Sequence, residues 1–172
     1  SALHARLKHK LSHISNVGLQ VGYRQTHCAD PARLDDSESG ALYAVDYKRR
    51  TESSTLLVVA ERRISPSGAG NLLESDKASV SYEAELSPLT QFSLQVRYFD
   101  NEAVDSQATL QSQRKLFYIE PELRRNLSRN WSVGFSYRYS SEDRSDGLGD
   151  AQSNALYLSL KYTPSFGSDV RP

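Results

Sequence analysis

The stretch WSVGFSYRY, residues 131–139, decides the fold predicted for this chain. Every second residue is apolar or aromatic, from Trp131 to Tyr139, and the residues between them, including Arg138, are small or polar. Side chains on a β-strand alternate between its two faces, so a period of two predicts a strand with one apolar face and one polar face.

The same alternation recurs along the whole chain, and no helical pattern competes with it. Residues 117–123 fit less well because Pro121 falls on the apolar face. Proline has no N–H to donate to a ladder, so we expect a bulge or a sheet edge there. Residues 1–15 hold either a first strand or a leader. The predicted strands are 3–11, 16–24, 41–48, 55–63, 80–86, 91–98, 117–123, 131–139 and 154–162.

The connections between these strands alternate in length. Short ones lie near 13–15, 51–53, 87–90 and 128–130, and long polar ones cover about 28–39, 65–76, 101–113 and 141–153. Bacterial outer-membrane barrels have short periplasmic turns and long outer loops, and strands of about 9–11 residues cross a bilayer. We therefore predict an all-β, antiparallel, up-and-down transmembrane β-barrel in the outer membrane, with a periplasmic tail at 163–172.

Composition narrows the function classes. The chain has 21 basic and 21 acidic residues, which argues against a nucleic-acid binder or a polybasic membrane-surface protein. No run of 18 apolar residues exists, so no transmembrane helix is expected. Cys28 is the single cysteine, so no intrachain disulfide forms. The low mean hydropathy fits a barrel because only every second strand residue meets lipid.

Two strand counts follow from this pattern. Residues 16–162 supply eight strands, which make a self-consistent small barrel. If residues 3–11 add a ninth strand, the chain is instead the C-terminal part of a larger barrel. In both cases residues 1–172 form one domain.

Two stretches, 130–139 and 153–162, resemble the closing hairpin of outer-membrane barrels associated with exopolysaccharide production and export. Two strands also resemble the signal that the barrel-assembly machinery reads, with Tyr157 departing from it in the last strand. The resemblance implies that lipid, lipopolysaccharide and the assembly machinery are partners and that a polysaccharide is the cargo. The matching residues are Ser132, Gly134, Tyr137 and Tyr139, and Asn16, Gly18, Val21 and Tyr23.

The polar faces of the strands are predicted to point into the barrel. In an eight-stranded barrel the interior is narrow, so these charges would pair in a network that plugs it. In a larger barrel they would line a water-filled pore. The residues are Arg24, Asp46, Lys48, Glu61, Arg63, Glu83, Glu85, Arg97, Glu120, Glu122, Arg124, Arg138 and Lys161.

Aromatic residues near strand ends are predicted to form girdles at the two lipid–water interfaces. Inward Tyr118 and Tyr157 could stack on sugars or pack inside the lumen. The girdle residues are Tyr23, Tyr47, Tyr98, Trp131, Tyr139 and Tyr162.

We expect no enzyme, no cofactor and no bound metal. Paired carboxylates such as Glu120 and Glu122 could act on sugars, but any charged strand face produces such neighbours. The histidines lie together near the N-terminus without a serine motif or a metal-binding spacing. The predicted function is an outer-membrane secretion or transport pore, or part of one, for an exopolysaccharide. The alternatives are a small structural or adhesive barrel with a plugged lumen and a soluble ligand-binding barrel.

Overall fold

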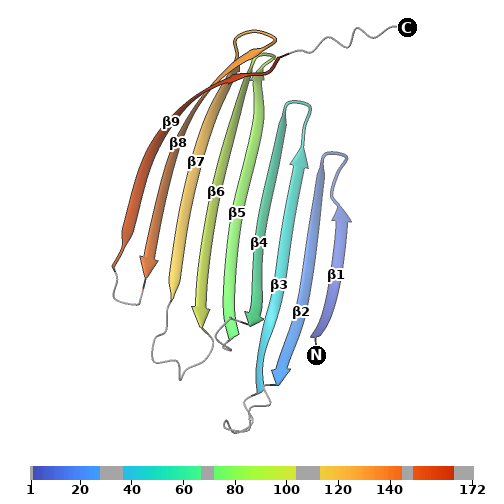
Figure 1. Cartoon of the computed structure of the whole chain (residues 1–172). Coiled ribbons are helices and arrows are strands. Elements are labelled where there is room, and N and C mark those ends of the chain that lie inside the picture. The colour runs from blue at the N-terminus through green and yellow to red at the C-terminus, as the bar shows by residue number, and fades with distance from the viewer. Residues whose placement is uncertain (1, 28–36, 67–71, 104–112, 145–148, 165–172) are drawn as a thin grey trace, which may run out of the picture.

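The computed structural model describes residues 2–27, 37–66, 72–103, 113–144 and 149–164, which form a single antiparallel β-sheet (Figure 1). Its nine strands lie side by side in chain order, each paired with the next. The predicted all-β, up-and-down, antiparallel fold is confirmed. The sheet is open, since no ladder between described residues joins β1 to β9.

Each predicted strand has a counterpart in the sheet, including the first one. Strands β2–β9 are 12 to 16 residues long, so the expected length of about 9–11 residues is wrong for them. Alternation is visible in sequence only where one face is apolar, whereas the backbone ladder continues where both faces are polar. The bounds are β1 Ala2–Lys10, β2 Ser15–His27, β3 Ser37–Arg50, β4 Ser54–Pro66, β5 Leu72–Ser87, β6 Thr90–Ala103, β7 Arg114–Asn126, β8 Trp131–Arg144 and β9 Ala151–Tyr162.

The connections alternate in length as predicted. At one end of the sheet, which we call the turn end, the connections are 11–14, 51–53, 88–89 and 127–130. At the other end, the loop end, they are 28–36, 67–71, 104–113 and 145–150. Each strand from β2 to β8 therefore joins a short turn at one end of the sheet to a longer segment at the other.

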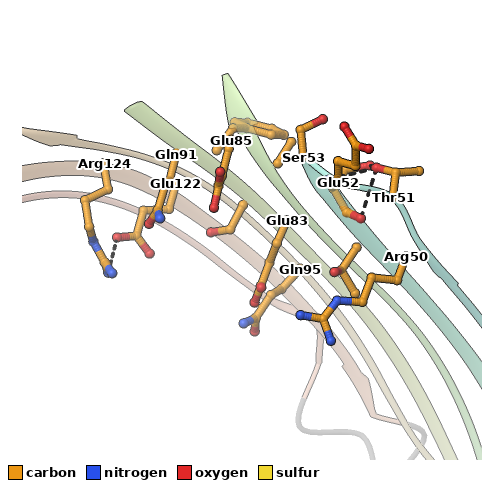
Figure 2. Close-up of a pocket in the computed structure, with 15 residues that line it drawn as sticks. Arg50, Thr51, Glu52, Ser53, Glu83, Glu85, Gln91, Gln95, Glu122 and Arg124 are labelled. Carbon is orange, nitrogen blue, oxygen red and sulfur yellow. Dashed lines mark hydrogen bonds and ion pairs between the residues drawn. The ribbon is translucent and has the colours of Figure 1, made fainter. Parts of the chain in front are cut away.

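The ladders fix which residues share a face, because residues paired across two antiparallel strands point to the same side. One continuous row runs from Val45 through Ala60, Ala78 and Tyr98 to Phe117. The neighbouring positions form the opposite, largely polar face. The sheet curves, and its polar side chains point to the inside of the curve (Figure 2). We call the two sides the concave polar face and the convex apolar face.

One ladder is shorter than those beside it. Strands β3 and β4 are paired only from Tyr43 opposite Arg62 to the turn end, whereas the flanking ladders continue to the loop end. The Arg24 guanidinium spans this split and donates a hydrogen bond of 2.9 Å to the carbonyl oxygen of Ile64. Ile64 is the one hydrophobic residue that is buried among the described residues. Its side chain packs against Gly40, where a β-carbon would collide with it.

The structure corrects the expectation at Pro121. Strand β7 is an interior strand, and β6 pairs with it through Leu94 opposite Pro121. On the β8 side, Ile119 faces Tyr139 and Glu122 faces Ser136, which is the same register before and after the proline. Neither a bulge nor a sheet edge is present at Pro121. The flanking pairs hold the register, so the missing N–H interrupts the β7–β8 ladder only locally.

Replacing Pro121 by valine should therefore stabilise the sheet. Pro121→Val supplies the missing N–H donor on an interior strand and keeps the convex side chain apolar. We expect a gain of about 0.5–1.5 kcal/mol in the free energy of unfolding, the usual net value of one hydrogen bond. Urea titration of the folded protein measures this difference, and a loss of stability would show that β7 needs the proline.

Candidate functional site

All the residues predicted to face a lumen lie on the concave polar face. The ladders show this directly, since Arg97 stands opposite Tyr118 and Glu61 stands opposite Lys77. Lys161 stands opposite Ser132 at the turn end. The predicted residues span strands β2 to β9, and the face that they share continues onto β1.

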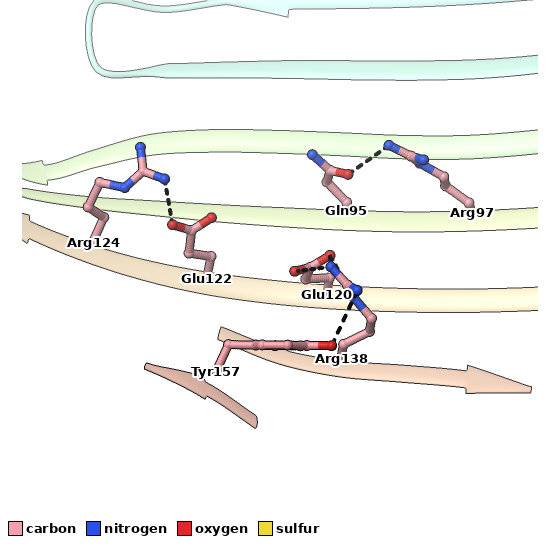
Figure 3. Close-up of polar contacts among 7 residues, drawn as sticks. All are labelled: Gln95, Arg97, Glu120, Glu122, Arg124, Arg138 and Tyr157. Carbon is pink, nitrogen blue, oxygen red and sulfur yellow. Dashed lines mark hydrogen bonds and ion pairs between the residues drawn. The ribbon is translucent and has the colours of Figure 1, made fainter. Parts of the chain in front are cut away.

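A cross-strand cluster occupies the middle of strands β7 to β9 on this face (Figure 3). The Arg138 guanidinium donates hydrogen bonds to both carboxylate oxygens of Glu120, at 3.2 Å from Nη2, and one to the Tyr157 hydroxyl at 3.4 Å. The guanidinium carbon also lies 4.9 Å from the centre of the Tyr157 ring and 5.6 Å from that of Tyr118. Arg97 approaches the Tyr118 ring as well, at 5.7 Å. Cation–π contact and ion pairing together fix Arg138.

The other ion pairs on the concave face lie within one strand or between neighbouring strands. Arg124 contacts Glu122 at 2.7 Å and Arg63 contacts Glu61 at 2.9 Å, each pair within one strand. Between strands, Lys77 approaches Glu61 at 3.7 Å and Arg114 contacts Glu142 at 2.8 Å. Within the described part of the chain, several of the predicted residues have no ion-pair partner: Asp46, Lys48, Glu83, Glu85 and Lys161. The concave face therefore carries separate local ion pairs, with unpaired charged residues between them, and not one continuous network.

A hollow of about 480 Å³ lies at the turn end of this face, between strands β3 and β7 (Figure 2). Its lining includes Glu83 and Glu85 from β5, with Arg50 from β3. The amides of Gln91 and Gln95 from β6 also line it. Arg50, Gln91 and Gln95 were missed as site residues, although their alternation with the apolar positions could have indicated them. The hollow offers hydrogen-bond donors and acceptors, and charges of both signs, to a polar solute.

The predicted girdle residues all lie on the convex face, at its two rims. Trp131 and Tyr162 meet at the turn end with ring centroids 4.8 Å apart, and Tyr47 lies at the same end of β3. At the loop end, Tyr139 packs against Phe117 with centroids 6.3 Å apart. The remaining two, Tyr23 and Tyr98, also lie toward the loop end of their strands.

A row of charged side chains crosses the convex face beyond the loop-end aromatics. Arg62 contacts Glu74 at 3.0 Å and binds both carboxylate oxygens of Asp76, and Lys115 approaches Asp100 at 3.9 Å. The ladders place Arg62, Asp76, Asp100 and Lys115 in one row. Sequence reasoning missed this row because it lies where the alternation of apolar residues ends.

The apolar residues of the convex face form a belt that is staggered along the sheet. In β3 the belt covers 41–47, about 20 Å of strand. The ladder row through Tyr47, the last belt residue of β3, reaches Asn154 in β9. In β9 the belt begins only after this row, at Leu156. Between β3 and β9 the belt is therefore displaced along the strands by about its full height. Strands that are tilted to a common axis produce such a stagger.

Nothing within the described residues covers this belt. The exposed fraction of the residue is 41% for Leu19, 51% for Phe135 and 78% for Leu158. Monomeric soluble proteins rarely expose continuous apolar patches larger than a few hundred Å². A soluble barrel would place these residues in a core, which the structure does not show for the described chain.

In the described part of the chain, no group of three or more histidine, cysteine, aspartate or glutamate side chains is arranged to hold a metal ion. Glu120 and Glu122 each pair with an arginine. Among the described residues there is no helix long and apolar enough to span a membrane.

Comparison with family models, with curated proteins and with solved structures gives no match to this chain. The two faces of the sheet are therefore the features from which a function can be inferred.

Proposed function

We propose that this chain is part of a bacterial outer-membrane β-barrel, with the convex apolar face toward lipid and the concave polar face toward a water-filled passage. The observation that carries this proposal is the staggered belt of exposed apolar side chains, bounded by aromatic rings at both rims. Exposing such an apolar belt to water is unfavourable, whereas contact with the hydrocarbon of a bilayer is favourable.

The arrangement of connections supports the same orientation. Short turns at one end and longer segments at the other match the periplasmic and outer ends of such barrels. The charged row around Arg62 and Asp76 then lies at the level of the lipid headgroups, just beyond the aromatic rim. Charges at that depth cost far less than at the centre of a bilayer.

A transport role follows from the concave polar face. Its hollow and its unpaired charges are accessible to water, and both signs of charge are present, which favours a polar solute over a simple ion filter. We propose a saccharide as the cargo, because two stretches resemble barrels of exopolysaccharide export. The rings of inward Tyr118 and Tyr157 already contact the guanidinium groups of Arg97 and Arg138, so a sugar would stack on them by displacing these contacts.

A second candidate is a small barrel with a closed lumen and a structural role. The pairing of Arg138 with Glu120 and Tyr157 favours it, since paired charges from neighbouring strands can fill a narrow interior. Conductance separates the two candidates: protein inserted into a planar bilayer passes a steady current if the lumen is open and none if it is plugged.

The membrane placement can be tested with the single tryptophan of the chain. Trp131 lies on the convex face and stacks on Tyr162. We expect its fluorescence to be quenched by lipids that carry bromine near the headgroup, and less strongly by lipids brominated near the end of the acyl chain. Emission that stays unquenched in both kinds of vesicle would contradict the proposal.

A further inference from the structure

The two outer edges of the sheet run in the same direction. Strand β1 begins at the loop end, where Ala2 faces Arg24, and finishes at the turn end. Strand β9 likewise finishes at the turn end, where Tyr162 faces Trp131. Every pair inside the sheet is antiparallel, but direct contact of β1 with β9 would be parallel. Copies joined head to tail in a ring would meet in the same parallel way.

Both edges continue the belt instead of ending it. Leu3 and Leu7 on β1 and Leu158 on β9 remain on the convex face and are strongly exposed. Neither strand contains a proline or a register shift, two devices that commonly protect a free edge. The unpaired backbone groups of these edges are especially unfavourable in hydrocarbon, where no water can bind them.

The concave side of the two edges carries one sign of charge. Arg6, Lys8 and Lys10 on β1 and Lys161 on β9 are basic, and no carboxylate lies on this side of β1, β2 or β9 within the described residues. The concave carboxylates belong to β3, β4, β5, β7 and β8. Across the described chain, Lys8, Lys10 and Lys161 have no ion-pair partner.

We infer that the seam between β1 and β9 is filled by an odd number of strands from outside β1–β9, at minimum one. Such a strand runs from the turn end to the loop end, so it is antiparallel to both neighbours. Its convex side chains are apolar, to continue the belt, and its concave side chains include carboxylates, to pair with the lysines. This inference rests on the proposed function for the closure of the sheet, whereas edge direction and edge charge do not depend on the membrane.

Synthetic peptides test the chemistry of the missing strand. One peptide alternates leucine with glutamate, and the matched control alternates leucine with lysine. Opposite charges across strands attract and like charges repel, so the full chain should bind the glutamate peptide at least about ten-fold more tightly. Equal affinities, or tighter binding of the lysine peptide, would overturn the charge argument.

Disulfide trapping tests the direction of the strand. In a Cys28→Ser background, Ser159→Cys places a thiol near the turn end of β9 and Ser153→Cys places one near the loop end. A glutamate peptide with an N-terminal cysteine should cross-link to Ser159→Cys, and one with a C-terminal cysteine to Ser153→Cys. The reverse pattern, or no cross-link to either variant, would refute the inference.

A third measurement asks whether the edges meet each other. In the same Cys28→Ser background, the double variant Ala5→Cys/Leu158→Cys, treated with a short bismaleimide, should not cross-link β1 to β9 within a chain or between copies. Either product would overturn the inference by showing a parallel seam. Quenching of Trp131 by brominated lipid reports membrane placement in the same samples, so failure of the seam and failure of the proposed function are distinguishable.

Discussion

An arginine at Val96 should lower the stability of the lipid-inserted protein by about 2–4 kcal/mol, the cost of this side chain on the lipid face near the bilayer centre. Val96 lies on the convex face of interior strand β6, between Val80 and Ile119. Its row is bounded by apolar neighbours on both sides, so the guanidinium would have no acceptor within the belt. Urea titration of the protein in vesicles measures the loss.

The matched control is Ser93→Arg, on the same strand but on the concave polar face. Ser93 stands between Glu83 and Glu122 in the ladders, so an arginine there meets two carboxylates and water. We expect a change within about 0.5 kcal/mol, as for an ordinary surface substitution. If Val96→Arg were as well tolerated as Ser93→Arg, the convex face would not contact lipid.

Removing the carboxylate of Glu120 should give the second large effect. Glu120→Ala leaves the Arg138 guanidinium between two tyrosine rings without its ionic partner. We expect a loss in the free energy of unfolding that is larger than for Glu122→Ala but smaller than for a fully buried pair, because the Arg138 side chain is 43% exposed. Chemical denaturation measures the loss, and Glu120→Gln should recover part of it by keeping one acceptor.

Glu122→Ala is the control for this effect. Glu122 pairs with Arg124 on its own strand, and that arginine is 51% exposed. Exposed pairs contribute little, so the expected loss is below about 1 kcal/mol. Similar losses for Glu120→Ala and Glu122→Ala would show that the cross-strand cluster around Arg138 adds nothing special to the sheet.

Much of the fold could be predicted because its strands have two unlike faces. The alternation in 131–139 identifies β8, and the same pattern places Glu120 and Arg138 on one side of the sheet. The loop-end extensions of the strands could not be predicted, since residues such as Asp76 and Asp100 lie where both faces are polar. Tertiary pairing, and not local periodicity, extends the ladder through them.

The sequence predicts which residues lie on the concave face better than it predicts the contacts between them. Sequence parity shows that Tyr118, Arg138 and Tyr157 share a face, but not that both rings contact one guanidinium. That contact depends on the register between three strands, which the turn lengths set. The prediction of a bulge or a sheet edge at Pro121 was wrong for a related reason. One missing N–H donor has only a local effect when the pairs on both sides of it hold the register.

The short ladder between β3 and β4 leaves the sheet with fewer backbone pairs at this joint than at the ladders beside it. Strands β2 and β3 are paired through their backbones as far as the loop end, and so are β4 and β5. Between these two pairs of strands, the loop-end half is bridged by the Arg24 hydrogen bond to Ile64 instead of by backbone pairs. Local opening starts where fewest bonds must break together, so we expect the amide protons beside this joint to exchange earlier than those of the neighbouring interior ladders.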